Sequence, residues 1–279
     1  MEQTFDTPRH LHLELRIPAG SIRVRAEQTS RTHLLIDGDR SPEDFRIVFD
    51  DDSSEHRLTI EYREHGKVFG WRSSELRVDV TVPLGTDVAC ETGSADLEVT
   101  GRIGSVAFRS GSGDCRFDDV EGELTVKVAS GDLAGATVGG GFTFSSASGD
   151  ARIRHIGGDA TGKTASGDLT LGTIGGSVQV TTVSGEVEIG SVAVGSTSVR
   201  SVSGDVEVGV ARGTRVFLDI GSTSGDTVSE LEMTDAAAGT GGPDLELQVG
   251  TVSGDIRIVR SAAGSIEERY AAEDSTSSE

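Results

Sequence analysis

Hydrophobic and polar residues alternate in short runs along the chain, and between residues 86 and 260 the alternation repeats about every eighteen residues. Alternation at every second position is typical of a β-strand with one buried face. In each repeat the first and third residues after an acidic residue are mostly apolar, as Leu169 and Leu171 are after Asp168. The residues eight and six positions before the acidic residue are mostly apolar too, so the alternation changes phase in between. Each repeat therefore predicts two short strands joined by a corner.

The corner carries the tripeptide Ser-Gly-Asp or a close variant of it. Its acidic residue recurs every eighteen positions at first and then at a looser spacing: Asp96, Asp114, Asp132, Asp150, Asp168, Glu186, Asp205, Asp226 and Asp255. Repeats of this length indicate a solenoid, in which like residues of successive coils stack about 4.8 Å apart. We therefore predict an all-β fold, a right-handed parallel β-solenoid (β-helix) of about nine 18-residue coils. The right hand follows the general preference for right-handed crossovers between parallel strands.

Three regions follow from this pattern. Residues 1–85 alternate without the repeat and predict an irregular β region that caps the first coil. Residues 86–260 form the Ser-Gly-Asp solenoid, and the acidic residues 261–279 predict a disordered tail. The first region contains a hydrophobic and basic loop, residues 67–72, in which Phe69 and Trp71 are candidate contacts for a partner or a bilayer surface. Loop aromatics more commonly fold back over a β core.

Composition and charge bear on which partners, cell compartment and cross-links we expect for this protein. The 279 residues carry a net charge of −21, which repels nucleic-acid phosphates, so we expect no nucleic-acid partner. The chain starts without a signal-peptide pattern and has no apolar run long enough to span a membrane, which predicts a cytoplasmic protein, with peripheral envelope association left open. Cys90 and Cys115 are too few for a disulfide framework and fall at inward positions, where cysteine acts as a small hydrophobe.

The stacked corner acids are the first candidates for chemistry. Carboxylates about 4.8 Å apart repel one another, and calcium between coils would relieve that repulsion, as in nonapeptide Gly/Asp solenoids. Here, however, each coil offers one carboxylate per eighteen residues. An aspartate beside a glycine is also well suited to accept hydrogen bonds from nearby backbone amides. We predict that the nine corner acids are structural turn residues and that there is no metal site, with a calcium ladder as the alternative.

Other catalytic and cofactor motifs do not fit this pattern. Residues 157–164, GGDATGKT, match the phosphate-loop pattern, but that mechanism needs a following helix, and here another Ser-Gly-Asp corner follows. His155 is the only histidine in the repeats, so no repeat serine has an evident base. Residues 90–260 contain no Trp or Tyr to form sugar-binding platforms. We therefore predict no cofactor and no enzymatic activity.

The V-P-x-G turn at residues 82–85 and the Ser-Gly-Asp repeats after it resemble the bacterial DUF4097 family of putative-adhesin β-strand-repeat proteins. The resemblance covers about residues 85–260, and residues 1–84 also look like the family. It implies a β-solenoid without an established activity, sometimes linked to surface adhesion or envelope stress, and it supplies no catalytic residues.

Together these features predict a non-enzymatic, adhesin-like scaffold that presents an acidic, hydroxyl-rich surface to a protein partner or to another copy of itself. The alternative is an envelope-stress or adhesion module that contacts a membrane or cell wall through residues 67–72.

Overall fold

The computed structural model describes the chain except for residues 39, 53, 64–75, 232–243 and 262–279. In the described part all regular structure is β, apart from one short 3-10 helix, η1 (Pro42–Asp44). No helix in this part is long and apolar enough to cross a membrane. The chain divides into two compact units, Met1–Gly140 and Gly141–Glu279, which we call unit 1 and unit 2.

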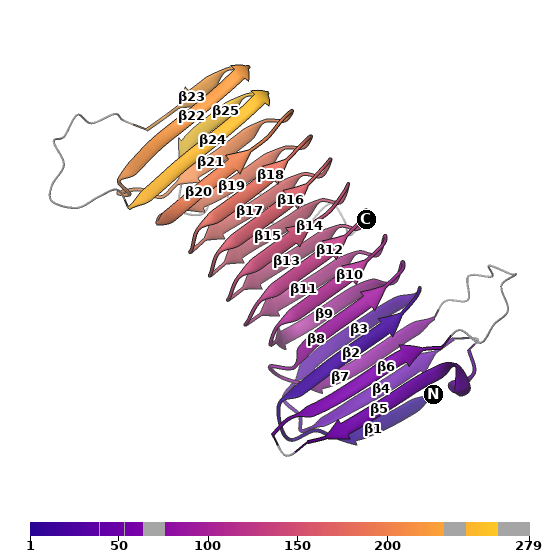
Figure 1. The fold of residues 1–279 in the computed structure, drawn as a ribbon. Helices are drawn as coiled ribbons and strands as arrows, with labels where there is room; N and C mark the ends of the chain where they lie inside the picture. The colour runs from indigo at the N-terminus through magenta and orange to yellow at the C-terminus, as the bar shows by residue number, and fades with distance from the viewer. Residues whose placement is uncertain (39, 53, 64–75, 232–243, 262–279) are drawn as a thin grey trace, which may run out of the picture. The chain divides into compact units, whose positions relative to one another are not determined.

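Unit 1 contributes strands to two sheets (Figure 1). One has the order β1-β4-β7-β3-β9-β11-β13 and the other β5-β6-β2-β8-β10-β12. The strand bounds are β1 (Glu2–Asp6), β2 (Leu11–Ile17), β3 (Ser21–Glu27), β4 (Arg31–Asp37), β5 (Phe45–Asp51), β6 (His56–Tyr62), β7 (Arg77–Pro83), β8 (Asp87–Thr92), β9 (Asp96–Ile103), β10 (Val106–Ser110), β11 (Cys115–Val120), β12 (Leu124–Val128) and β13 (Leu133–Val138).

The N-terminal strands of unit 1 end both sheets with antiparallel pairs. Strand β4 pairs antiparallel with β7 and with β1, and β5 pairs antiparallel with β6, whereas β2, β3 and the later strands pair in parallel. Strands β1 and β5 are therefore the edge strands of the two sheets in this unit. Strands from residues 1–85 thus lie in the same sheets as the first repeats, and a domain boundary at residue 85 stays a prediction.

Unit 2 also contributes strands to two sheets, in the orders β15-β17-β19-β21-β25-β23 and β14-β16-β18-β20-β24-β22. All strand pairs described within it are parallel. The bounds are β14 (Phe142–Ser145), β15 (Ala151–Ile156), β16 (Ala160–Thr164), β17 (Leu169–Ile174), β18 (Val178–Thr182), β19 (Val187–Val192), β20 (Gly195–Arg200), β21 (Val206–Val210), β22 (Val216–Ser224), β23 (Thr227–Ser229), β24 (Leu245–Ser253) and β25 (Ile256–Arg260).

The last coil in the sequence of unit 2 is not the last coil in space. The coil β24–β25 lies between the coil β20–β21 and the coil β22–β23. Its inward side chains Leu245 and Leu247 are fully buried, whereas Leu218 and Ile220 of β22 are only half-buried. The coil β24–β25, whose inward side chains are more completely buried, is thus covered on both sides. The coil β22–β23 takes the outer position.

The core follows the eighteen-residue register. Val106 of β10 pairs with Val88 on one side and Leu124 on the other, so apolar residues of successive coils stack inside. Phe142 and Phe144 are fully buried with ring centroids 6.5 Å apart. The predicted all-β solenoid is confirmed, and its handedness stays a prediction.

The two cysteines are buried and unbonded to each other. Burial raises the pKa of Cys90 to about 12 and raises the pKa of Cys115 further. Because the thiolate is the reactive form of cysteine, both side chains are unreactive members of the core.

Glycine at the corner is required by the distance between coils. A Cβ added at Gly167 would lie 2.0 Å from the carbonyl oxygen of Gly149 in the preceding coil, which is far inside van der Waals contact. Gly131 has the same relation to Gly113 in unit 1. A side chain at these two positions would force neighbouring coils apart, which explains why the corners from Gly113 onward carry glycine, whereas the first corner carries Ala95.

The substitution Gly167→Ala should therefore destabilise the protein by about 1–3 kcal/mol, the usual cost of overpacking. Gly250→Ala is the matched control, because nothing lies within 4 Å of an added Cβ there, and its effect should stay within about 0.5 kcal/mol. Urea denaturation of both variants measures the difference. Equal denaturation midpoints for the two variants would show that coil spacing does not depend on the corner glycine.

Candidate functional site

The predicted corner acids form a hydrogen-bonded ladder with the backbone of the neighbouring coil. In each bond the Oδ1 atom of one corner residue accepts the N–H of the corner residue in the next coil. The bonds run from Asp114 to Asp96 (2.9 Å), Asp132 to Asp114 (3.0 Å), Asp168 to Asp150 (2.9 Å), Glu186 to Asp168 (2.8 Å), Asp255 to Asp205 (2.8 Å) and Asp226 to Asp255 (2.8 Å). One oxygen of each accepting carboxylate is thereby used inside the fold, which favours the structural interpretation over a calcium ladder.

The corners occur in two conformations. In the first, the glycine N–H donates to a Ser or Thr hydroxyl three residues earlier, as from Gly149 to Ser146 (2.6 Å) and from Gly167 to Thr164 (2.9 Å). In the second, found at Gly185, Gly204, Gly225 and Gly254, the glycine has a φ between +148° and +152°, a value that favours glycine. At three of these corners the corresponding hydroxyls, those of Thr182, Ser201 and Thr251, are buried without a hydrogen-bond partner. At the fourth, the Ser222 hydroxyl donates to Gly254 O at 3.0 Å.

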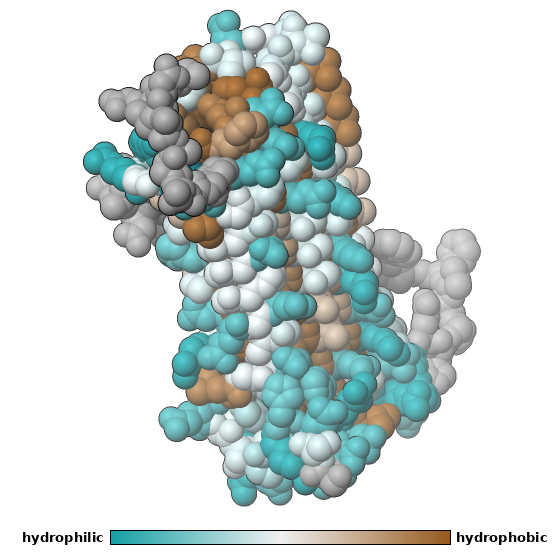
Figure 2. All heavy atoms as spheres, turned by 60° about the vertical axis from the view of Figure 1, so that its left-hand side comes forward, coloured by the Kyte–Doolittle hydropathy of each residue, from teal (hydrophilic) through white to brown (hydrophobic). Residues whose placement is uncertain are grey.

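Three of the four corners in the second conformation carry an exposed valine, and the fourth carries Thr223. Val183, Val202 and Val252 precede the Ser-Gly pair of these corners and are 52%, 49% and 52% exposed. They stack in successive coils, because Ser203 N–H donates to Val183 O (2.8 Å) and Ser253 N–H donates to Val202 O (2.9 Å). We call these three residues the valine row. Figure 2 shows that exposed hydrophobic side chains form separate brown patches among wide areas of near-neutral and hydrophilic surface.

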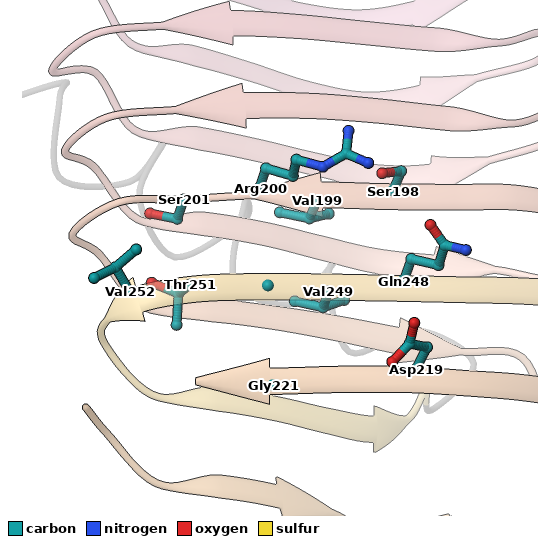
Figure 3. A pocket seen from close by; sticks show the side chains of 11 residues that line it. Ser198, Val199, Arg200, Ser201, Asp219, Gly221, Gln248, Val249, Thr251 and Val252 are labelled. Atoms are coloured by element: carbon teal, nitrogen blue, oxygen red, sulfur yellow. The ribbon is translucent and has the colours of Figure 1, made fainter. Parts of the chain in front are cut away.

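A shallow groove adjoins the valine row on the outer face of β20, β24 and β22 (Figure 3). Its floor is formed by Gly250 and Gly221, which pair across the strands and leave open space where side chains would stand. Arg200, Gln248 and Asp219 border this floor. Val252 lines the groove as well as belonging to the row. The glycine groove thus offers a guanidinium, an amide and a carboxylate beside an apolar ridge.

Of two further motifs singled out from the sequence, the structure describes one, residues 157–164, and not the other, residues 67–72. Residues 157–164 contain strand β16, in which exposed Lys163 pairs with Ser145 and Thr181, so the helix that phosphate binding requires is missing from this described segment. Phe69, Trp71 and the rest of residues 67–72 lie outside the described residues. Contact of that loop with a membrane or cell wall stays a prediction.

Sequence reasoning missed the valine row and the glycine groove. The row has a visible signal, because Val replaces the Ala147 and Ala165 of earlier corners. The groove has none, since Gly221 and Gly250 are 29 residues apart and meet only because β24 lies beside β22.

The comparisons with known proteins agree with this architecture. The family model described as Toastrack DUF4097 matches residues 10–259, so the chain belongs to the DUF4097 family. No curated protein matches the chain.

Among solved structures, the chain is similar to a putative adhesin from Bacteroides fragilis, with 11% identity, a TM-score of 0.46, and 93% of this chain and 96% of that chain covered. It is also similar to a putative lipid binding protein from Parabacteroides distasonis, with 14% identity, a TM-score of 0.45 and the same coverage. A putative cell adhesion protein from Clostridium sporogenes matches with 10% identity and a TM-score of 0.31, covering 93% of this chain and 99% of that chain. At these identities and scores the likeness carries no functional argument.

Glu186 is the corner acid whose negative charge is disfavoured by its surroundings. Burial and, after it, the carboxylates of Asp168, Glu188, Asp205 and Glu207 raise its pKa above the ordinary value. An acid whose pKa is raised by folding keeps its proton longer in the folded state, so stability falls as the pH rises from the ordinary value through the raised one. At neutral pH the ionised Glu186 therefore opposes folding.

We expect Glu186→Gln to stabilise the protein at pH 7 by roughly a few tenths of a kcal/mol at low salt, and less at high salt because exposed charges are screened. Near pH 4, where Glu186 is largely protonated, the gain should shrink. The control Glu98→Gln removes a carboxylate that pairs with Arg23 at 2.9 Å and should give no gain. Urea midpoints at both pH values test this, and a gain that is equal at pH 4 and pH 7 would contradict the electrostatic cause.

Proposed function

We propose that the protein is a non-enzymatic, adhesin-like scaffold that binds a protein partner through the valine row and the glycine groove of unit 2. The observation that carries this proposal is the valine row. Three branched apolar side chains are half exposed in register on successive coils, at a position where the other corners of the unit carry Ala147, Ala165 and Thr223. Contiguous exposed apolar surface on an otherwise polar protein is typical of an interaction site.

The charges around the row specify the kind of partner. Each valine is followed three residues later by a corner acid, namely Glu186, Asp205 or Asp255. The chain as a whole carries −21, which favours association with basic surfaces. A partner segment with apolar side chains flanked by Lys or Arg therefore complements this surface.

The same surface lacks the arrangement that catalysis requires. The residues that line the described groove include no histidine or cysteine, and its charged groups Arg200 and Asp219 stand on separate strands on either side of β24. Nucleophilic or acid–base catalysis needs a nucleophile or titratable group within hydrogen-bond reach of a partner that activates it. The groove fits recognition better than reaction.

The double variant Val202→Asp/Val252→Asp should abolish partner binding, because it places two charges on the apolar ridge. Wild type and variant are used as baits in lysate of the source organism, followed by chemical crosslinking and mass spectrometry. Wild type should crosslink near residues 183–252 to a partner whose contact segment is basic, and binding should weaken at high salt. A second copy as partner would instead appear as a concentration-dependent dimer of purified wild type that the variant does not form.

Leu84→Asp is the matched control, since Leu84 is 40% exposed on unit 1 and lies outside the proposed surface. It should bind like wild type. If the double variant keeps the wild-type partners and assembly state, binding does not use the valine row and the proposal fails.

A further inference from the structure

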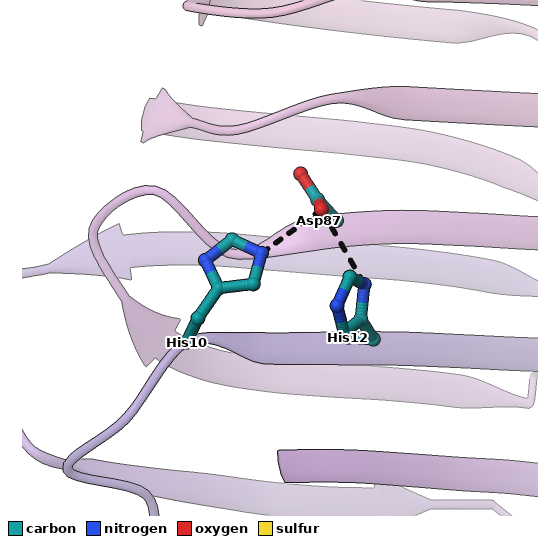
Figure 4. A group of neighbouring side chains, drawn as sticks. All are labelled: His10, His12 and Asp87. Carbon is teal, nitrogen blue, oxygen red and sulfur yellow. Dashed lines mark hydrogen bonds and ion pairs between the residues drawn. The ribbon is translucent and has the colours of Figure 1, made fainter. Parts of the chain in front are cut away.

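Two histidines and an aspartate converge on the outer face of unit 1 (Figure 4). His10 Nε2 lies 2.9 Å from Asp87 Oδ2, and His12 Nδ1 lies 3.3 Å from the same oxygen. The ligand atoms of all three side chains lie within 4.8 Å of one another. The two imidazole rings stand edge to face with centroids 4.8 Å apart.

The strand pattern explains why these side chains meet. Leu11 and Leu13 of β2 point into the core, so His10 and His12 must face outward. Strand β8 pairs in parallel with β2, and the register places Asp87 directly opposite His12. In the turn before β8, Gly85 takes a φ of +74°.

Asp87 is held in place by the fold through only one of its two oxygens. Its Oδ1 atom accepts the Ser105 N–H at 2.7 Å. A Cβ at Gly104 would lie 2.4 Å from this oxygen, so the glycine makes room for the carboxylate. Its Oδ2 atom is left to face both imidazoles.

Glu55 orients His12 from the other side. Its Oε2 atom lies 2.6 Å from His12 Nε2, a short hydrogen bond to a carboxylate. When Nε2–H donates to Glu55, the neutral ring has a lone pair on Nδ1, and this lone pair faces Asp87 Oδ2. Two acceptors at 3.3 Å attract each other only through a cation between them, which is either a proton on His12 or a bound metal ion.

We propose that His10 Nε2, His12 Nδ1 and Asp87 Oδ2 form a Zn²⁺ site, with water in the fourth position and Glu55 orienting His12 from outside. Tetrahedral zinc with bonds of 2.0–2.1 Å separates its ligand atoms by about 3.3 Å, close to both distances to Asp87. Binding the ion would require the exposed His10 ring to rotate so that its nitrogen moves nearer to His12, since the ligand atoms are spread over up to 4.8 Å. Imidazole ligands select zinc and its transition-metal neighbours over calcium and magnesium, and a carboxylate behind a ligating histidine is the usual outer-shell arrangement.

Untagged full-length protein, freed of metal by chelator and dialysis, is titrated with ZnSO4 in a calorimeter at pH 7.5. Wild type should bind one Zn²⁺ per chain, and its melting temperature should rise with zinc because the ion binds the folded state. His12→Ala and Asp87→Asn should each weaken binding at least about tenfold. Asp87→Asn retains the Oδ1 acceptor for Ser105, so a loss there is not a loss of fold. Glu55→Gln should weaken binding by about tenfold or more while the stoichiometry stays one.

The control is His33→Ala. His33 Nε2 contacts Glu2 Oε1 at 2.8 Å on the surface of unit 1 but belongs to no three-ligand group among the described residues, so this variant should bind zinc like wild type. Co²⁺ replaces Zn²⁺ in a second measurement, and its visible absorption should report four-coordinate geometry in wild type and in His33→Ala but not in His12→Ala. The proposal is overturned if wild type does not bind Zn²⁺, or if His12→Ala binds it as tightly as wild type. The three side chains would then be held together by a proton on His12, which lies between the carboxylates of Asp87 and Glu55.

Discussion

Close stacking of one coil on the next is the constraint on which the rest of the structure depends. Strands pair about 4.8 Å apart, so whatever occupies the corner of one coil must fit against the backbone of its neighbour. Gly167 satisfies this because its Cα faces the Gly149 carbonyl oxygen, which a Cβ would approach to 2.0 Å. Asp168 accepts the next amide through its carboxylate. The Gly and Asp of the tripeptide are therefore the residues that the short distance between the backbones of neighbouring coils requires.

The same constraint explains where binding chemistry is free to develop. Inward positions hold the apolar core, and at least six of the nine corner acids use one carboxylate oxygen to accept an amide of the neighbouring coil. Outward strand positions and the residue before Ser-Gly carry no such requirement, so Val183, Val202 and Val252 stand where earlier corners have Ala147 and Ala165. The valine row, the glycine groove and the His10–His12–Asp87 cluster all occupy positions of this kind. A repetitive scaffold thus acquires distinct surfaces without altering its coils.

Much of the architecture was predictable from the sequence because it depends on local period. The alternation around Asp168 gave two strands and a corner, and the match of residues 10–259 to the DUF4097 family agrees with the resemblance noted from the repeats. The inward placement of Cys90 and Cys115 followed from the same parity. What was not predictable depends on which coils are neighbours. The position of β24 between β20 and β22 breaks the sequence order, so Gly221 and Gly250 meet without a sequence signal. His12 and Asp87 are 75 residues apart and are brought together only by strand register.

The most direct measurement of the corner ladder is hydrogen exchange at the Glu186 amide, followed by NMR in wild type, Asp168→Ala and Asp168→Asn. This amide lies at an exposed corner and donates to Asp168 Oδ1 at 2.8 Å. It should be protected in wild type and in Asp168→Asn, which keeps an acceptor oxygen. In Asp168→Ala it should exchange about tenfold faster, because a hydrogen bond of about 1 kcal/mol or more is lost. Equal exchange rates in wild type and Asp168→Ala would show that the carboxylate does not hold the neighbouring coil.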